Sequence, residues 1–140
     1  MTGMRIFLDA NILVSVVNKE YPVFPVCAKI LSLSDRPGFQ LYTSSLSLAI
    51  TWYFVSKKHG SSLARKKMEL LLANISIADC GSKETLAAIE LKKADDFEDA
   101  MQYYSALNAG CDHIVTSNIE DFYFSEITVS SPEAFFRFLY

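Results

Sequence analysis

Short apolar runs alternate with helix-like segments along this chain, and this alternation constrains the fold more than any other feature. Strand-like runs are expected at residues 5–8, 39–43, 75–78, 113–116 and 127–129. Helical patterns fill the intervals at residues 10–18, 22–33, 44–58, 63–74, 83–93 and 97–108, and Ser131-Pro132-Glu133 opens a last helix. Strands joined by helices form right-handed βαβ units, which give a mostly parallel sheet covered on both faces. The sequence therefore predicts an α/β fold, a three-layer α/β/α sandwich around about five strands.

The size and composition of the chain fit one packed domain. With 140 residues, it can bury roughly two thirds of its unfolded surface around one core. Hydrophobic residues make up 51% of the chain and charged residues 21%, which excludes a disordered protein. The formal net charge of −3 gives no overall attraction for nucleic acid, so any contact with RNA needs a local basic patch or metal ions. We expect a single domain over residues 1–140.

Neither the cysteines nor the apolar runs indicate a secreted or membrane protein. Cys27, Cys80 and Cys111 lie far apart and form no CxxC pair, so neither a zinc site nor a disulfide framework is predicted. The apolar run near the N-terminus is much shorter than the core of a signal peptide, and no run approaches roughly 18 apolar residues. We expect a cytoplasmic protein with free thiols and no membrane contact.

Several acidic and amide side chains fall where the predicted strands end. Asp9 ends the first strand, Asn118 and Asp121 follow the fourth, and Asp99 lies in the first turn of the helix at 97–108. In open parallel sheets, ligands bind beyond the carboxyl ends of the strands, so these side chains point toward one crevice. Clustered carboxylates repel one another unless a cation neutralises them, and hard oxygen ligands suit Mg²⁺ or Mn²⁺. Spacing alone leaves the alternative open that each acid only caps a helix or turn.

Three stretches form a pattern that spans nearly the whole chain. The first is IFLDANIL at residues 6–13, where an apolar run is followed by Asp, a small residue and Asn. The second is DFEDA at 96–100, which continues through AGCDHIVTSN at 109–118. The third is NIEDF at 118–122. Together they resemble the motifs of the PIN-domain family, which includes toxin ribonucleases of the VapC type.

The resemblance implies that Asp9, Asp99 and Asp121 are the catalytic, metal-binding acids of an endoribonuclease that uses Mg²⁺ or Mn²⁺. It implies RNA as the substrate and an antitoxin protein as the partner in a toxin–antitoxin pair, and it leaves a homodimer open. It also implies supporting residues, whose amide and hydroxyl groups hold water, metal or phosphate or whose carboxylates act as accessory acids. These supporting residues are Asn11, Thr116, Asn118, Asp96 and Glu98.

One position departs from the family pattern. In SSLSLAITWY at residues 44–53, the usual pattern has a glutamate after the small residue that aligns with Ala49, and here that position is Ile50. An alkyl group cannot bind a cation, so the predicted site loses one charge and two acceptor oxygens. On a helix Ile50 shares a face with Leu46 and with Tyr53 or Phe54, which indicates a packing role.

This departure supports a second hypothesis, that the chain is a catalytically weakened or inactive PIN-like domain acting as an RNA-binding or protein-interaction module. A third hypothesis, phosphoryl transfer through Asp9 as nucleophile, is disfavoured because Asn11 stands where such enzymes commonly place a second aspartate.

The dense basic stretch that surrounds His59-Gly60 could contact an RNA backbone or form a solvated helical face. It comprises Lys57, Lys58, Arg65, Lys66 and Lys67.

Overall fold

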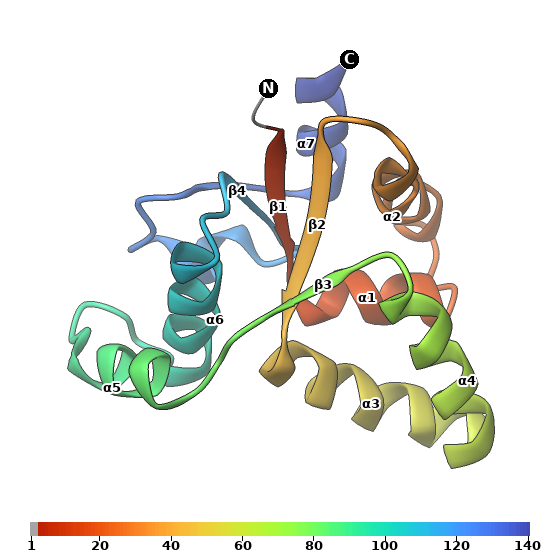
Figure 1. The fold of residues 1–140 in the computed structure, drawn as a ribbon, viewed down its shortest axis with the longest axis horizontal. Helices are drawn as coiled ribbons and strands as arrows, with labels where there is room; N and C mark the ends of the chain where they lie inside the picture. Colours follow the sequence, from red (N-terminus) through yellow and green to blue (C-terminus); the bar gives the residue numbers. More distant parts are fainter. Residues whose placement is uncertain (1–2) are drawn as a thin grey trace.

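The computed structural model of the chain describes residues 3–140 and contains one five-stranded sheet (Figure 1). The strands are β1 (Met4–Leu8), β2 (Phe39–Ser44), β3 (Ser76–Ala78), β4 (His113–Val115) and β5 (Thr128–Ser130). Their spatial order is β3-β2-β1-β4-β5, and every pairing between neighbours is parallel. Starting from β1, the chain first adds β2 and β3 on one side and then β4 and β5 on the other. A switch point of this kind is where open α/β sheets bind ligands.

Helices connect the strands, and two short 3-10 turns interrupt the loops. The α-helices are α1 (Ala10–Val17), α2 (Phe24–Leu31), α3 (Ser45–His59), α4 (Ser61–Leu72), α5 (Ser82–Glu90), α6 (Phe97–Asn108) and α7 (Pro132–Leu139). The 3-10 turns are η1 (Ser32–Asp35) and η2 (Ile119–Phe122). Within residues 3–140, none of the helices has the length and apolar character needed to cross a bilayer.

Successive side chains of β1 face two different helical layers. Ile6 and Leu8 are fully buried in a core shared with α1, α2, α4 and α7, whereas Phe7 is fully buried in a second core shared with α6. Strand residues alternate between the two faces of a sheet, so helices must cover both faces to bury such a strand. Figure 1 shows α5 and α6 on one side of the sheet and α1, α2 and α4 on the other. The predicted three-layer α/β/α architecture with a parallel sheet is confirmed.

Polar side chains fix the starts of three helices. The Ser44 hydroxyl accepts a hydrogen bond from the backbone of Ser47, and Ser131 does the same for Ala134 at the start of α7. Asp96 accepts from the backbone N–H groups of Glu98 and Asp99, which begins α6. Each cap satisfies backbone donors that have no partner inside the helix. The cap on α6 also sets the direction in which the acids of its first turn project.

Two helices are shorter than the sequence pattern indicates. The segment predicted as a helix from residue 22 to 33 begins at Phe24 and gives way to the η1 turn after Leu31. The helix predicted to reach residue 93 ends at Glu90, because Leu91 leaves helical geometry with ψ 82°. Apolar spacing continues across these ends, but it does not show where the backbone changes to a tighter turn.

The last helix is only partly buried. Phe135 is fully buried and its ring lies 4.8 Å, centroid to centroid, from that of His113. Phe138 and Tyr140 are 64% and 70% exposed. The α7 helix therefore docks against the sheet mainly through Phe135, while Phe138 and Tyr140 face solvent.

Candidate active site

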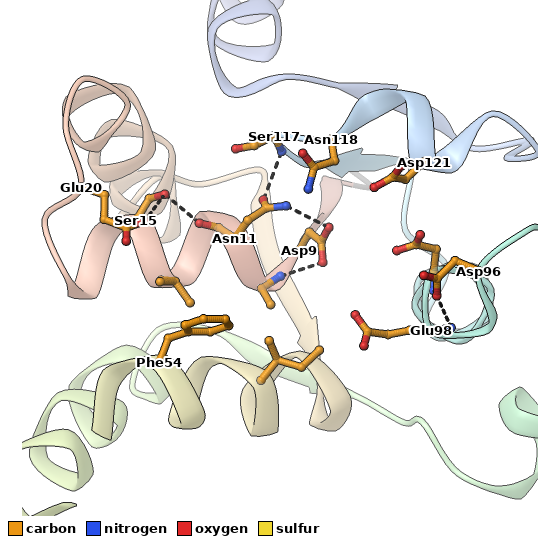
Figure 2. A pocket seen from close by; sticks show the side chains of 14 residues that line it. Asp9, Asn11, Ser15, Glu20, Phe54, Asp96, Glu98, Ser117, Asn118 and Asp121 are labelled. Carbon is orange, nitrogen blue, oxygen red and sulfur yellow. Dashed lines mark hydrogen bonds between the residues drawn. The ribbon is translucent and has the colours of Figure 1, made fainter. Parts of the chain in front are cut away.

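A cleft of about 530 Å³ lies beyond the carboxyl ends of β1 and β4 (Figure 2). Its lining includes the three acids predicted to bind metal, Asp9, Asp99 and Asp121. They reach it from different elements, namely the end of β1, the first turn of α6 and the η2 turn. The other predicted residues in its lining are Asn11, Asp96, Glu98 and Asn118.

Asp9 is held in place by three hydrogen bonds. One carboxylate oxygen accepts from the backbone N–H of Ala10 at 2.8 Å, so Asp9 caps α1. The other oxygen accepts from the Thr116 hydroxyl at 2.9 Å and from the Asn11 amide at 3.3 Å. Burial nevertheless raises the pKa of Asp9, and the negative charge of Asp121 raises it further. The charged form of Asp9 thus lacks a full set of compensating partners.

Thr116 and Asn11 tie the ends of β1 and β4 together beneath the cleft. Thr116 is fully buried, and its hydroxyl accepts hydrogen bonds from the Asn11 side chain at 3.2 Å and from the Asn118 backbone at 3.1 Å. The side-chain amide oxygen of Asn11 accepts from the backbone N–H of Ser117 at 3.1 Å. These contacts give Thr116 and Asn11 a positioning role toward Asp9, while Asn118 remains on the exposed rim.

The first turn of α6 concentrates negative charge on one side of the cleft. Burial raises the pKa of Asp99 from its ordinary value of 3.8 to about 7, and the charges of Asp96, Asp121, Asp9 and Glu98 add to this effect. Burial, followed by the charges of Asp96 and Asp9, also raises the pKa of Glu98. Carboxylates from three elements therefore lie within electrostatic reach of one another.

The acids that line the cleft offer the type of ligand that a hard divalent cation binds. All of these acids offer oxygen, the ligand that Mg²⁺ and Mn²⁺ prefer, and a bound cation would remove the repulsion that raises the pKa of Asp99. Across residues 3–140, no group of three or more histidine, cysteine or acidic side chains is arranged to hold a metal ion as it stands. Asp121 and Glu98 are exposed at the edge of the cleft, and the charges of both raise the pKa of Asp99.

The opposite side of the cleft is apolar, and sequence reasoning found only part of it. Ile50 lines the cleft as the family pattern implies, and Phe54 and Val14 line it beside Ile50. The spacing of Ile50 and Phe54 along α3 was a signal for a shared face, but that face was expected to pack in the core. Glu20, in the loop after α1, also lines the cleft and accepts a hydrogen bond from Ser15 at 3.4 Å. No sequence motif marks Glu20.

The raised pKa of Asp99 predicts a pH-dependent stability. Because the folded-state value of about 7 exceeds the ordinary 3.8, the folded protein binds the proton more tightly, and its free energy of unfolding should fall as pH rises from about 4 to 7. Above pH 7 this contribution is constant. His113, whose pKa is lowered by burial, acts in the opposite direction, so the test is the difference between wild type and Asp99→Asn.

Denaturant unfolding in chelator from pH 4 to 8 measures that difference. Wild type should lose stability relative to Asp99→Asn across this range, and saturating Mn²⁺ should remove the loss. Parallel pH profiles for the two proteins in chelator would show that Asp99 titrates normally.

Known proteins share this arrangement of strands and helices. A family model described as PIN domain matches residues 5–120. Ribonuclease VapC1 of Aquifex aeolicus (strain VF5) is 33% identical over 144 residues, which cover 96% of this chain and 95% of the relative. The VapBC2 structure from Rickettsia felis, bound to a DNA fragment from its promoter, has a TM-score of 0.70 at 23% identity and covers 91% of this chain and 98% of its own. A toxin–antitoxin complex from Klebsiella pneumoniae has a TM-score of 0.68 at 18% identity, with 91% and 97% covered. The chain belongs to the PIN domain family.

Proposed function

We propose that this chain is a divalent-metal-dependent endoribonuclease and the toxin of a toxin–antitoxin pair. The observation that carries the proposal is the cleft at the sheet's switch point, where Asp9, Asp99 and Asp121 converge from three elements. The likeness to a VapC ribonuclease along 96% of the chain supports RNA as the substrate class. The likeness to a toxin–antitoxin complex supports an antitoxin protein as the partner.

The predicted acids and the polar residues near them would divide the tasks of this activity. Asp9, Asp99 and Asp121 would hold Mg²⁺ or Mn²⁺, and the bound ion would supply an activated water and stabilise the charge on the phosphate. Thr116 and Asn11 keep the Asp9 carboxylate oriented through the hydrogen bonds described above. On the rim, the Asn118 amide and the Ser117 hydroxyl are exposed donors that can bind phosphate oxygens.

A second candidate function, an RNA-binding or protein-interaction module without catalysis, is favoured by Ile50 in the cleft. We give it the lower rank because Glu98 lines the same cleft and lies within electrostatic reach of Asp9. Glu98 thus adds a carboxylate to Asp9, Asp99 and Asp121 in the lining of the cleft, even though position 50 contributes none. Ile50 should therefore weaken metal binding and cleavage without abolishing them.

Metal titration tests the proposed function directly. We expect Asp99→Asn to weaken Mn²⁺ binding in calorimetry by at least about 10-fold, because losing a direct ligand should cost no less than losing an outer partner of a ligand. Asp35→Asn, which removes an exposed carboxylate outside the cleft, should bind Mn²⁺ like wild type. Wild type should cleave RNA in Mn²⁺ and stop in chelator. Cleavage that persists in chelator, or equal Mn²⁺ binding by wild type and Asp99→Asn, would refute the metal-dependent mechanism.

A further inference from the structure

The cleft has two chemically different sides. Acids of α6 and η2 form one side, and three apolar side chains form the other, Val14 from α1 with Ile50 and Phe54 from α3. Figure 2 shows the Phe54 side chain extending from α3 toward α1, on the side of the cleft away from Asp96 and Glu98. We call Val14, Ile50 and Phe54 the apolar wall. It stands beside the position where the reacting phosphate would bind.

The Phe54 ring is not part of either hydrophobic core. It is 47% exposed and absent from the two buried clusters that hold the sheet and helices together. Its neighbour Tyr53 is 57% exposed and contacts it edge-on, with 5.1 Å between ring centroids. The Lys57 ammonium lies 5.7 Å from the Tyr53 ring. Folding thus leaves an aromatic ring in a polar cleft, where it can contact a ligand.

The position of Ile50 makes this wall continuous. Ile50 and Phe54 are four residues apart on α3, so their side chains neighbour each other on one helical face. A carboxylate at position 50 would bring charge and its hydration between Phe54 and the acids. The isoleucine instead adds apolar surface beside Phe54 in the lining of the cleft.

We propose that the apolar wall binds the base of an unpaired nucleotide, stacked on Phe54, next to the phosphate that is cleaved. This inference rests on the proposed function and adds to it a binding site for one base of the RNA. Aromatic rings hold RNA by stacking on bases that have been freed from a helix, whereas a base inside a duplex has no free face. The cleft volume of about 530 Å³ lies within the range of sites that enclose small ligands. Tyr53 and Lys57 continue the surface along α3, where a neighbouring base and phosphate can bind.

The charge of the cleft accounts for the orientation of the nucleotide. The acids of α6 and η2 repel a phosphate unless a cation lies between them, so the phosphate belongs on the metal side and the uncharged base on the apolar side. The basic residues of α3 and α4 are partly engaged elsewhere, since Lys58 donates to the Asn18 carbonyl and Arg65 lies 5.4 Å from the Trp52 ring. Stacking on the apolar wall therefore adds to the contacts that the remaining lysines can make with phosphates.

Equilibrium binding of short RNA tests the apolar wall apart from catalysis. We would measure fluorescence anisotropy in Ca²⁺, with a single-stranded oligomer, its duplex, and an abasic oligomer of the same length and charge. Phe54→Ala should weaken binding of the single strand by on the order of 5- to 100-fold, the range measured when one stacking ring is removed. Phe54→Trp should retain binding because it keeps a stacking ring. Leu70→Ala, at a 73% exposed residue outside the cleft, is the matched control.

Three results would overturn the inference. They are equal affinity of wild type for the normal and abasic oligomers, affinity for duplex equal to that for single strand, and unchanged single-strand binding by Phe54→Ala. The abasic comparison uses wild type only, so it tests base binding even where Phe54→Ala fails to fold.

Mn²⁺ calorimetry on the same proteins tests the proposed function separately. Loss of metal binding with stacking intact would reject the nuclease, and normal metal binding without a base effect would reject the apolar wall.

Discussion

Replacing Asp9 with asparagine should lower Mn²⁺-dependent RNA cleavage by on the order of 10²-fold or more, because it removes a charged metal ligand while preserving the shape of the side chain. Asp9 is the central acid of the cleft: its charge raises the pKa of both Asp99 and Glu98, and it is itself affected by Asp121. A cation bound among these residues would lose one of its principal oxygen ligands. A cleavage assay over a range of Mn²⁺ concentrations measures the effect.

The same variant should fold about as well as wild type. Asparagine keeps a carbonyl oxygen for the Ala10 N–H, so the cap of α1 survives. Its amide nitrogen replaces the oxygen that accepts from Thr116 and Asn11, so those two hydrogen bonds are lost. Removing a carboxylate whose pKa is raised by burial relieves a cost of folding that offsets this loss. We expect a thermal midpoint that is unchanged or higher, with Asp35→Asn as the control.

Two outcomes would contradict this picture of Asp9. Unchanged cleavage by Asp9→Asn would mean that another site, or a contaminating nuclease, cuts the RNA. A large loss of thermal stability would mean that Asp9 serves mainly as a helix cap and hydrogen-bond acceptor. Because activity and stability are measured on one variant, the two explanations can be separated.

The positions of the acids could be predicted from sequence because they follow from the topology of the sheet. A buried strand that ends at Asp9 and another that ends before Asn118 must bring those residues to the same edge once both strands are parallel. Asp99 needed one further signal, the start of α6, which the sequence allows either Asp95 or Asp96 to cap and which Asp96 caps in the structure. In each case a local pattern and a general rule of parallel sheets determine the location.

The remaining features of the cleft depend on contacts between distant segments. The η2 turn that carries Asp121 has four residues, too few to produce a periodic pattern. The exposure of Phe54 depends on how far α3 lies from α1, and spacing along α3 indicates only that Phe54 and Ile50 share a face. Thr116 was expected to hold water, metal or phosphate, yet its hydroxyl is already engaged with Asp9, Asn11 and Asn118. A motif gives the residue type, and the fold decides what the side chain contacts.

Ile50 separates the two leading hypotheses, because they differ on whether the missing carboxylate matters. If the chain is a weakened nuclease, Ile50→Glu adds an oxygen ligand to the cleft that contains Asp9, Asp99 and Glu98. We expect Mn²⁺ binding and RNA cleavage to increase together, by on the order of 10- to 100-fold, comparable to the effect of other changes around metal sites. Ile50 is only half-buried, so the cost to the free energy of unfolding should be about 1 kcal/mol, the centre of the range for point substitutions.

Ile50→Gln is the matched control for this gain, since it has nearly the same size as glutamate and interrupts the apolar wall equally, but adds no charge. Calorimetric Mn²⁺ titration, RNA cleavage and denaturant unfolding on wild type and both variants distinguish the hypotheses. For a binding module, both variants should destabilise the fold by roughly 1–3 kcal/mol without binding more metal, because a polar group enters an apolar surface. Strong wild-type cleavage that Ile50→Glu leaves unchanged would show that position 50 does not limit the site. An increase seen with glutamate but not with glutamine would assign the effect to the carboxylate itself, and would identify Ile50 as the residue that restrains this nuclease.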